Sequence, residues 1–526
     1  AALYQVQSRY GEAESLYQRA LVIYEQALGP THPDTASSLN NLAALYQVQS
    51  RYGEAESLYQ RALAIREQVL GTTHPDTAQI LNNLATLYQA QEQLHVALAH
   101  LNRGLAIQES VLSQNLVGGS DANKRDYLAT VAGTTDAAIS LHLDNLPNDS
   151  AAAELAFTTV LQRKGRILDL FTNLRAQLAN DPAALNLLNQ LTATTTQLST
   201  LVYDPSVDPT SAGYQTQRSE LQQRIRDLED DLSRRSTEFD DLTASPSLAQ
   251  IRDALPLGTA LIEFIRYQPF DPKAPARFGK ERYAAYVVKA DGTFHGVDLG
   301  STAELEPLIT DAMFAMRTPR IRISQVKEAT QALYQRLFDR LNPYLADAEH
   351  LLISPDGALN LIPFEALVTE EGSYLVENVQ ISYLTSGRDL VRLQQESQPA
   401  QPPVVMVDPI FGQSSQQATV PARASSLQSL SFPPLAATVE EGQAIASVLE
   451  GAQLYEGDQA TEARLKQNSS SKILHVATHG FFLSNEGELQ NPLLRSGLVL
   501  SGFRDSKLSD GEDGILTALE VTGLNL

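Results

Sequence analysis

Two histidines, His475 and His479, lie four residues apart in the stretch HVATH and have the clearest capacity for chemistry in the chain. This spacing holds zinc when both residues lie on a helix, with a glutamate between them as the base. Here the surrounding residues 473–478 are almost wholly apolar, which predicts a strand covered on both faces. Four residues of strand separate two side chains by roughly 13 Å. The pair therefore cannot share a metal ion, and we predict no metal site.

A catalytic role for His479 requires a partner, because an imidazole acts by moving a proton to or from another group. The sequence contains no Gly-x-Ser-x-Gly nucleophile elbow and no Gly-rich phosphate-binding loop. It also contains no cysteine, which excludes disulfides and thiolate metal sites. We predict no cofactor. From these residues alone, a purely structural role for a histidine at a strand end stays open.

The elements around His479 predict a parallel α/β fold over residues 397–526. Such sheets place their ligands at the carboxyl ends of the strands, where His479 and Gly480 follow a predicted strand. Asp408 ends another predicted strand near the same face, so it either shapes a substrate pocket or caps the turn before Pro409. Strands are predicted at 404–408, 453–455 and 473–478, and helices at 438–451, opened by a capping box of Thr438 and Glu441, and at 461–466.

A second α/β region is predicted over residues 251–396. Within it, Ser354–Gly357 has the sequence SPDG and predicts a tight turn after a buried strand. Residues 397–434 are rich in Gln, Ser and Pro and predict a loose loop at the boundary. The predicted strands are 260–267, 282–290, 350–356 and 379–384, and the predicted helices are 302–316 and 324–341.

Helical patterns fill the first half of the chain. Residues 2–43 recur at 44–85 with six differences, which is a period of 42 residues. Each unit carries two helical patterns separated by a short polar turn, the second of these turns being at 47–52. Residues 122–250 are helical without a repeat. Their apolar seam is too short for an independent coiled coil and predicts a helix packed in a local hairpin; it comprises Leu221, Ile225, Leu228 and Leu232.

Composition narrows the classes of partner. The chain has 526 residues and a formal net charge of −23, which disfavours direct binding to nucleic acid. No apolar run approaches the ~20 residues needed to cross a bilayer, so we predict no membrane contact. The absence of cysteine suits the cytoplasm, where we place the protein. Because the first residue is Ala1, we expect the true N-terminus to be missing.

The repeats over residues 1–121 resemble tetratricopeptide repeats, in the 42-residue variant found in kinesin light chains. The residues that match the signature spacing are Leu42, Ala43, Tyr46, Ala55, Tyr59 and Ala62. The resemblance implies an all-α solenoid whose groove binds a protein or peptide partner. Four asparagines on the first helix of each pair either bond the backbone of that peptide or cap the helix starts: Asn40, Asn41, Asn82 and Asn83.

Five ordered motifs further along resemble the CHAT family, a caspase-related group commonly fused to tetratricopeptide repeats in bacteria. They are RKGRILD (163–169), LLISPDGALNLIPFEAL (351–367), YLTSGRDL (383–390), ILHVATHGFF (473–482) and NPLLRSGLVLSG (491–502). The resemblance implies a multidomain chain with a mostly parallel α/β region like that of caspases and separases. Its parts would be the repeats at 1–121, a helical region at 122–250, a degenerate caspase-like half at 251–396 and the start of the catalytic half at 397–526.

The same resemblance gives His479 the role of general base for a cysteine thiolate, and Gly480 the role of an oxyanion donor through its N–H. In caspases the cysteine follows the histidine by about 50 residues, which here falls beyond Leu526. Since Ala1 also begins in mid-repeat, we expect the sequence to be truncated at both ends. The implied function is a bacterial cysteine endopeptidase that recruits a partner through its repeats and cleaves a polypeptide substrate. The alternative is a non-catalytic adaptor.

Overall fold

The computed structural model describes residues 1–117, 120–167, 181–204, 207–236, 246–274, 276–318, 320–394, 401–412, 432–468, 470–483, 491–503 and 512–524. The chain forms two compact units. The first contains Ala1–Gln114, Asp126–Arg166 and Thr243–Gln395, and the second contains Asn115–Arg125, Ile167–Leu242 and Glu396–Leu526. The helical region expected at 122–250 is therefore divided between them. No helix in the described ranges is both long enough and apolar enough to cross a membrane.

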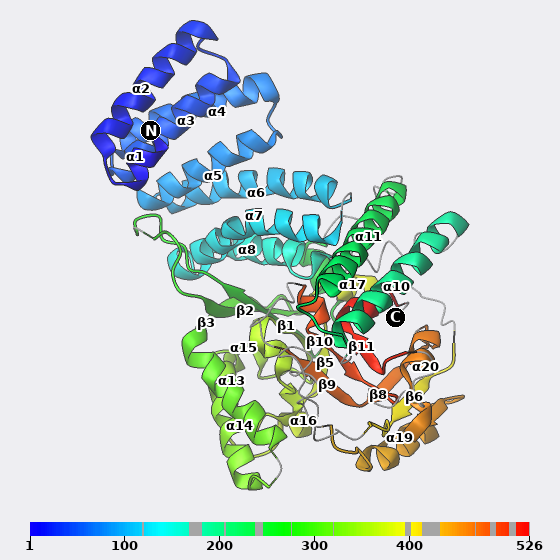
Figure 1. The fold of residues 1–526 in the computed structure, drawn as a ribbon. Helices are drawn as coiled ribbons and strands as arrows, with labels where there is room; N and C mark the ends of the chain where they lie inside the picture. Colours follow the sequence, from blue (N-terminus) through cyan, green and yellow to red (C-terminus); the bar gives the residue numbers. More distant parts are fainter. Residues whose placement is uncertain are drawn as a thin grey trace. The chain divides into compact units, whose positions relative to one another are not determined.

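The first unit begins with the paired helices of the repeats, drawn in blue in Figure 1. Alanines at the helix crossings are fully buried, including Ala43, Ala55 and Ala62, so that adjacent helices pack closely. His32 and His74 cap the first helix of their pairs by accepting a hydrogen bond from the backbone N–H two residues on. The helices are α1 (Ala2–Val6), α2 (Tyr10–Ala27), α3 (Pro33–Val48), α4 (Tyr52–Leu70), α5 (Pro75–Ala90) and α6 (Leu94–Val117).

A five-stranded sheet follows, in the order β3-β2-β1-β4-β5. Strand β4 pairs parallel with β1 and β5, whereas β2 pairs antiparallel with β1 and β3. Alternate residues of β2 face opposite sides: Tyr283 lies in one hydrophobic cluster and Ala284 in the other. The strands are β1 (Thr259–Tyr267), β2 (Arg282–Lys289), β3 (Phe294–Ser301), β4 (His350–Ser354) and β5 (Gln380–Tyr383).

Helices cover both faces of this sheet. On one face, residues of α13 and α14 join the cluster that contains Tyr283. On the other face, residues of α8 and α12 join the cluster that contains Ala284. The turn predicted after β4 is present, with Gly357 at a φ of 56° that favours glycine. The remaining helices of the unit are α7 (Asp121–Ser140), α8 (Ser150–Arg163), α12 (Leu248–Ala254), α13 (Thr302–Arg317), α14 (Ile323–Phe338), α15 (Asn342–Leu345), α16 (Leu375–Asn378) and α17 (Asp389–Leu393), with the π-helix Leu141–Asn145 after α7.

The second unit contains a helical hairpin and two three-stranded sheets. Helices α10 (Pro182–Tyr203) and α11 (Ala212–Ser236) form the hairpin predicted from the apolar seam. The parallel sheet has the order β7-β6-β8, and the antiparallel sheet has the order β11-β10-β9. Their strands and covering helices are β6 (Val404–Val407), β7 (Gln453–Glu456), β8 (Leu474–Ala477), β9 (His479–Phe482), β10 (Ser496–Val499), β11 (Ile515–Thr517), α19 (Ala437–Val448), α20 (Glu462–Gln467) and α21 (Ala518–Val521).

Two details of the second unit differ from the prediction. The run 473–478 is not covered on both faces, because every residue of β8 is only partly buried, whereas those of the central strand β6 are wholly buried. The predicted capping box at the start of α19 is also wrong. That helix begins after Ala436 without a side-chain cap, and the Thr438 hydroxyl instead accepts a hydrogen bond from Asp408 N at 3.0 Å.

Candidate active site

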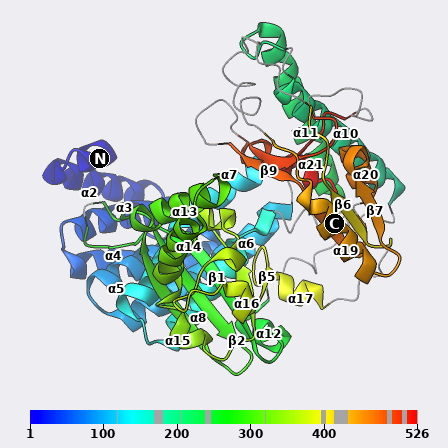
Figure 2. The ribbon, with the colours of Figure 1, turned by 90° about the horizontal axis from the view of Figure 1, so that it is seen from below.

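His479 is the first residue of β9, immediately after the chain leaves the parallel sheet. Strand β8 ends at Ala477, which lies opposite Val407 at the end of β6. The carboxyl ends of β6 and β8 therefore lie side by side, and Asp408 and His479 each follow one of them within two residues. Figures 1 and 2 show β6 with α19 and α20 in this part of the second unit. The expectation that His475 and His479 share one strand is wrong, since they lie on β8 and β9.

The imidazole of His479 is oriented by a backbone carbonyl. Its Nε2 lies 2.8 Å from Pro433 O. A carbonyl oxygen only accepts hydrogen bonds, so Nε2 carries the proton in this contact. In the neutral ring the other nitrogen, Nδ1, then has a lone pair that is able to accept a proton. This arrangement gives His479 a defined tautomer, and no charged side chain in the described ranges takes part in it.

Two phenylalanines flank the ring of His479. The ring centres of Phe411 and Phe432 lie 5.4 and 5.5 Å from that of His479, both in tilted arrangements. Phe432 also packs edge-on against Phe503 at 5.5 Å. These contacts hold the imidazole at the margin of an aromatic cluster, which restricts its rotation about the axis set by Pro433.

The backbone N–H of Gly480 points away from the neighbouring strand. Antiparallel strands exchange hydrogen bonds at every second residue pair. Leu483 N donates to Arg495 O at 2.7 Å, and this register makes His479 with Val499 a bonded pair and Gly480 with Leu498 a non-bonded pair. The Gly480 N–H is thus directed at the outer edge of β9, which is the edge strand of its described sheet.

The absence of a side chain at position 480 is not forced by crowding within the protein. A Cβ atom there would approach Gly497 O to 3.7 Å, an ordinary contact. Gly480 is itself exposed. What the glycine does provide is an N–H at the edge of β9 that no residue in the described ranges accepts.

Asp408 has an unusual backbone conformation for a residue with a side chain. Its φ is 48°, in the left-handed region, and it directly precedes Pro409. Its own N–H donates to Thr438, which holds the bend. The carboxylate makes no hydrogen bond to other described residues, so the described ranges give no support to the turn-capping interpretation. Strained residues of this kind are concentrated at functional sites.

His475 has different surroundings from His479. Its Nε2 lies 3.2 Å from Glu441 Oε1 of α19, although the angles do not meet those of a hydrogen bond. The His475 side chain is 28% exposed. Within the described ranges, no three His, Asp or Glu side chains are grouped so that they could hold a metal ion.

The asparagines of the repeats lie in the middle of their helices, so the helix-start capping interpretation is wrong. Asn83 Nδ2 of α5 donates to Asn40 Oδ1 of α3 at 2.9 Å, which links the first helices of successive pairs. Asn41 is exposed. Asn82 lies against α6: a Cβ atom on Gly104 would come within 2.2 Å of its Oδ1. Asn82 therefore packs between helices, whereas the other three lie on the linked faces of α3 and α5.

Several residues of the site were not found from the sequence. Phe411 lies before residues 413–431, and Phe432 and Pro433 lie after them. Of the loose loop expected at 397–434, Pro433 supplies the carbonyl that orients His479, whereas residues 397–400 and 413–431 lie outside the described ranges. The only local signal was the pair Pro433–Pro434 after Phe432, which restricts the backbone before α19.

Three of the five motifs converge in the first unit, on the side chain of Lys164. Its ammonium donates to Glu263 Oε1 at 2.6 Å and to Ser354 Oγ at 2.7 Å. Glu263 Oε2 in turn accepts from Gly387 N at 2.6 Å, and Glu263 and Ser354 are fully buried. Arg388 donates to Lys164 O. The motifs at 163–169, 351–367 and 383–390 are therefore parts of one buried polar network.

Comparisons with known protein families match both the repeats and the region that follows them. The sequence model of the CHAT domain matches residues 327–526, and that of the tetratricopeptide repeat matches residues 1–61 and 34–110. No curated protein matches the chain.

Among solved structures, similar chains include a protein from Podosopora anserina described as a kinesin light chain with nearly identical TPR-like repeats. It is 19% identical, with 34% of this chain and 93% of that chain covered and a TM-score of 0.20. A single-substitution variant of it is 18% identical over 34% and 91%, also at 0.20. At this TM-score the similarity carries no argument, so the fold rests on the sequence matches and the helix pairs. On this evidence the chain contains tetratricopeptide repeats followed by a CHAT domain, the domain of a caspase-like family.

Proposed function

We propose that this chain is the repeat-bearing and histidine-bearing part of a bacterial CHAT-type cysteine endopeptidase. The observation that supports this most is the hydrogen bond from His479 Nε2 to Pro433 O, which leaves Nδ1 as the basic nitrogen. The next residue, Gly480, directs its N–H to the edge of β9. A thiol at this edge meets a base and an oxyanion donor together. The nucleophile is a cysteine outside these 526 residues, which contain none.

In the proposed reaction, His479 Nδ1 takes the proton of the thiol, and the sulfur forms a bond to the carbonyl carbon of the scissile peptide. Negative charge moves to the carbonyl oxygen, where the Gly480 N–H stabilises it. Protonated His479 then gives its proton to the leaving amine as the C–N bond breaks. A water molecule, deprotonated by His479, cleaves the thioester and releases the thiol. Pro433 O keeps the ring oriented in each step.

Asp408 is the proposed substrate-binding residue. Its position at the end of β6 beside the end of β8 supports this role, as does its strained backbone. A carboxylate at this edge favours a substrate with a basic side chain near the scissile bond.

The repeats are proposed to bind a protein or peptide in their groove. The linked asparagines Asn40 and Asn83, and the exposed Asn41, carry the amide groups that can bond an extended backbone. Asn82 has no such role in this proposal because it packs against Gly104. The net charge of −23 and the absence of cysteine support a cytoplasmic protein that does not bind nucleic acid directly.

The second candidate is a non-catalytic adaptor in which both parts serve as interaction surfaces. One observation favours it: the chain itself has no cysteine. The two candidates differ in what the full-length protein contains and in whether His479 alters the reactivity of a thiol.

The test uses the full-length protein and measures the rate of iodoacetamide labelling between pH 6 and pH 8. Pairing with His479 lowers the pKa of a thiol, so labelling should be fast below pH 8. His479→Ala should slow it by roughly tenfold or more and abolish peptide cleavage, with little change in stability. His475→Ala is the matched control and should leave labelling nearly unchanged. Equal labelling rates in wild type and His479→Ala, or a full-length protein without a cysteine, would favour the adaptor.

A further inference from the structure

One face of helix α10 carries two side chains that contact the part of the second unit that bears His479. Thr196 and Tyr203 are seven residues apart, which is close to two helical turns, so they project from the same face. Both make side-chain hydrogen bonds to residues more than 200 positions further along the chain. The hairpin of α10 and α11 is therefore joined to the C-terminal strands and not only packed on itself.

We call strand β9, which begins at His479, together with its neighbour β10 the His479 edge. Tyr203, the last residue of α10, contacts β9 and a residue just before β10. Its ring packs edge-on against Phe481 of β9, with ring centres 5.9 Å apart and planes at 76°. Phe481 is two residues after His479 and so projects from the same side of the strand. The Tyr203 hydroxyl donates to Leu494 O, just before β10. Tyr203 is 8% exposed, and burial raises its pKa, so the hydroxyl keeps its proton in this contact.

Thr196 joins α10 to the third strand of the same sheet. Its hydroxyl donates to Glu520 Oε1 at 2.9 Å, and Glu520 lies in α21, directly after β11. Lys466 Nζ lies 3.1 Å from the same hydroxyl and 3.0 Å from Glu520 Oε1. Leu198 of α10 packs in one cluster with Leu519 of α21. One helix thus contacts residues of, or next to, all three strands of the antiparallel sheet.

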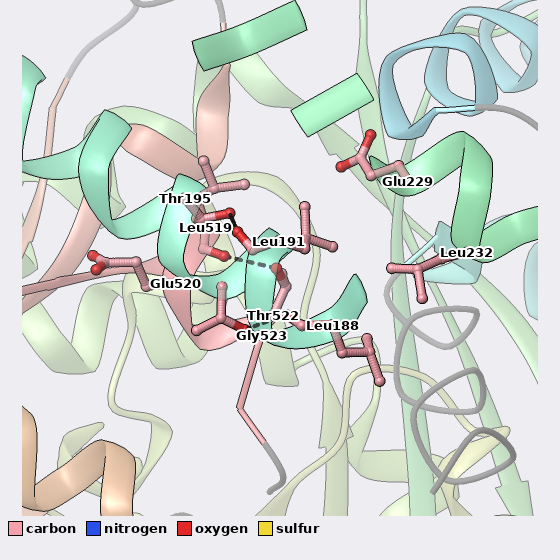
Figure 3. Close-up of a pocket in the computed structure, with 10 residues that line it drawn as sticks. Leu188, Leu191, Thr195, Glu229, Leu232, Leu519, Glu520, Thr522 and Gly523 are labelled. Carbon is pink, nitrogen blue, oxygen red and sulfur yellow. Dashed lines mark hydrogen bonds between the residues drawn. The ribbon is translucent and has the colours of Figure 1, made fainter. Parts of the chain in front are cut away.

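The joint between the hairpin and α21 is not completely filled. A cavity of about 30 Å³ lies among α10, α11 and α21 (Figure 3), enough for a water molecule. Leu191, Leu519 and the carboxylate of Glu229 line it. A void removes packing contacts from the atoms around it. The attachment of α10 to the sheet therefore depends more heavily on the side-chain contacts of Tyr203 and Thr196.

From these contacts we infer that α10 is the positioning element of the His479 edge, and that Tyr203 is the residue through which it acts. The ring of Tyr203 fixes β9 from the side of Phe481, and its hydroxyl fixes the start of β10. The position of His479 relative to Pro433 O then depends on a helix that lies far from it in the sequence. The claim that α10 supports catalysis rests on the proposed function, whereas the claim that it positions β9 and β10 does not.

The experiment compares Tyr203→Phe with wild type in the 526-residue chain by hydrogen–deuterium exchange. Loss of one hydroxyl bond should speed exchange of peptides covering β9 and β10 by roughly threefold to tenfold. Peptides covering β6 should not change. The NMR ring signals of His479, assigned with His479→Gln, should move in Tyr203→Phe because the ring changes position, which a purely structural loss elsewhere would not cause. Tyr455→Phe is the matched control, because that hydroxyl bonds Gln453 of its own strand.

Unchanged β9 exchange and unchanged His479 ring signals in Tyr203→Phe would overturn the inference, as would equal acceleration in every peptide of the second unit. None of these readouts needs a cysteine. If Tyr203→Phe loosens β9 but His479→Ala leaves thiol labelling of the full-length protein unchanged, the positioning role stands and the proposed peptidase function fails.

Discussion

The ammonium of Lys164 is surrounded by oxygen atoms from two separate segments. Besides Glu263 and Ser354, it donates to Phe264 O at 2.8 Å and to Ser354 O at 3.0 Å. Only 10% of the Lys164 side chain and none of that of Glu263 is exposed. In the sequence, RKGR resembles a basic surface segment, yet a charge this well surrounded is part of the core. The side-chain partners lie 99 and 190 residues away, so no local pattern could have revealed them.

Lys164→Met should therefore destabilise the protein by about 3–5 kcal/mol, because it leaves the buried carboxylate of Glu263 without its partner. Urea unfolding followed by circular dichroism measures the change. Lys273→Met is the control: its ion pair with Glu92 is exposed, so its loss should leave the stability nearly unchanged. If Lys164→Met does not fold, the double variant with Glu263→Met should recover folding. A loss below about 1 kcal/mol for Lys164→Met would contradict the prediction.

At the scale of elements, the same hydrogen bonds join successive helix pairs of the repeats. Tyr46 OH donates to Glu14 Oε1 at 3.1 Å and accepts from Gln18 Nε2 at 3.0 Å. The equivalent Tyr88 bonds Glu56 at 2.9 Å and Gln60 at 3.2 Å. These tyrosines are 6% exposed and also fill the space between helices. They combine packing with a hydrogen-bonded link between successive pairs.

Tyr46→Ala should cost about 3–5 kcal/mol, since it removes a buried ring as well as these bonds. Tyr46→Phe keeps the ring and should cost about 1 kcal/mol, and thermal unfolding measures both changes.

Asn83→Ala should change stability by less than about 1 kcal/mol while weakening the binding of a peptide selected by phage display on the wild-type chain. Thermal unfolding and titration calorimetry check the two effects. A large loss of stability with unchanged peptide binding in Asn83→Ala would remove the asparagine from the groove.

The sequence was sufficient for the repeats and for most strands, because their signals are local. The 42-residue recurrence and the alanine spacing led directly to the helix pairs. The start of a new strand, β9, at His479 could not be predicted in this way. β9 pairs with β10, and the Thr478 hydroxyl before it donates to Val499 O, 21 residues away, so this pairing depends on residues distant in the sequence. The same limit applies to Pro433, whose carbonyl is 46 residues from His479.

At the scale of the whole molecule, the excess of acidic residues is not confined to the surface. Lys466 in the second unit is contacted by Glu462 at 2.8 Å, Glu512 at 3.2 Å and Glu520 at 3.0 Å. One cation cannot neutralise three carboxylates. Burial, together with the neighbouring carboxylates Glu520 and Asp513, raises the pKa of Glu462 to about 9. Burial also raises the pKa of Asp513 to about 6.

These shifts predict that the second unit loses stability as the pH rises. A carboxyl whose pKa is higher in the folded state binds its proton there, so its contribution is complete below about 4.5 and disappears as the pH approaches 9. Thermal unfolding at pH 6, 7.5 and 9 should show a falling transition temperature. The underlying loss in the free energy of unfolding is on the order of 1 kcal/mol per pH unit. Glu462→Gln should flatten this dependence, and the exposed Glu440→Gln should not. A slope that survives Glu462→Gln unchanged would assign the effect to other groups.

The register of the contacts between repeats has a consequence for how this protein can vary over generations. Because residues 2–43 and 44–85 are nearly the same, loss of one 42-residue unit places Tyr88 opposite Glu14 and Gln18, where Tyr46 lay before. Each side chain then finds a partner identical to the one it lost. The solenoid can therefore shorten or lengthen in whole steps of 42 residues without losing these contacts. The length of the solenoid can change while the α/β regions that follow it in the chain keep their sequence.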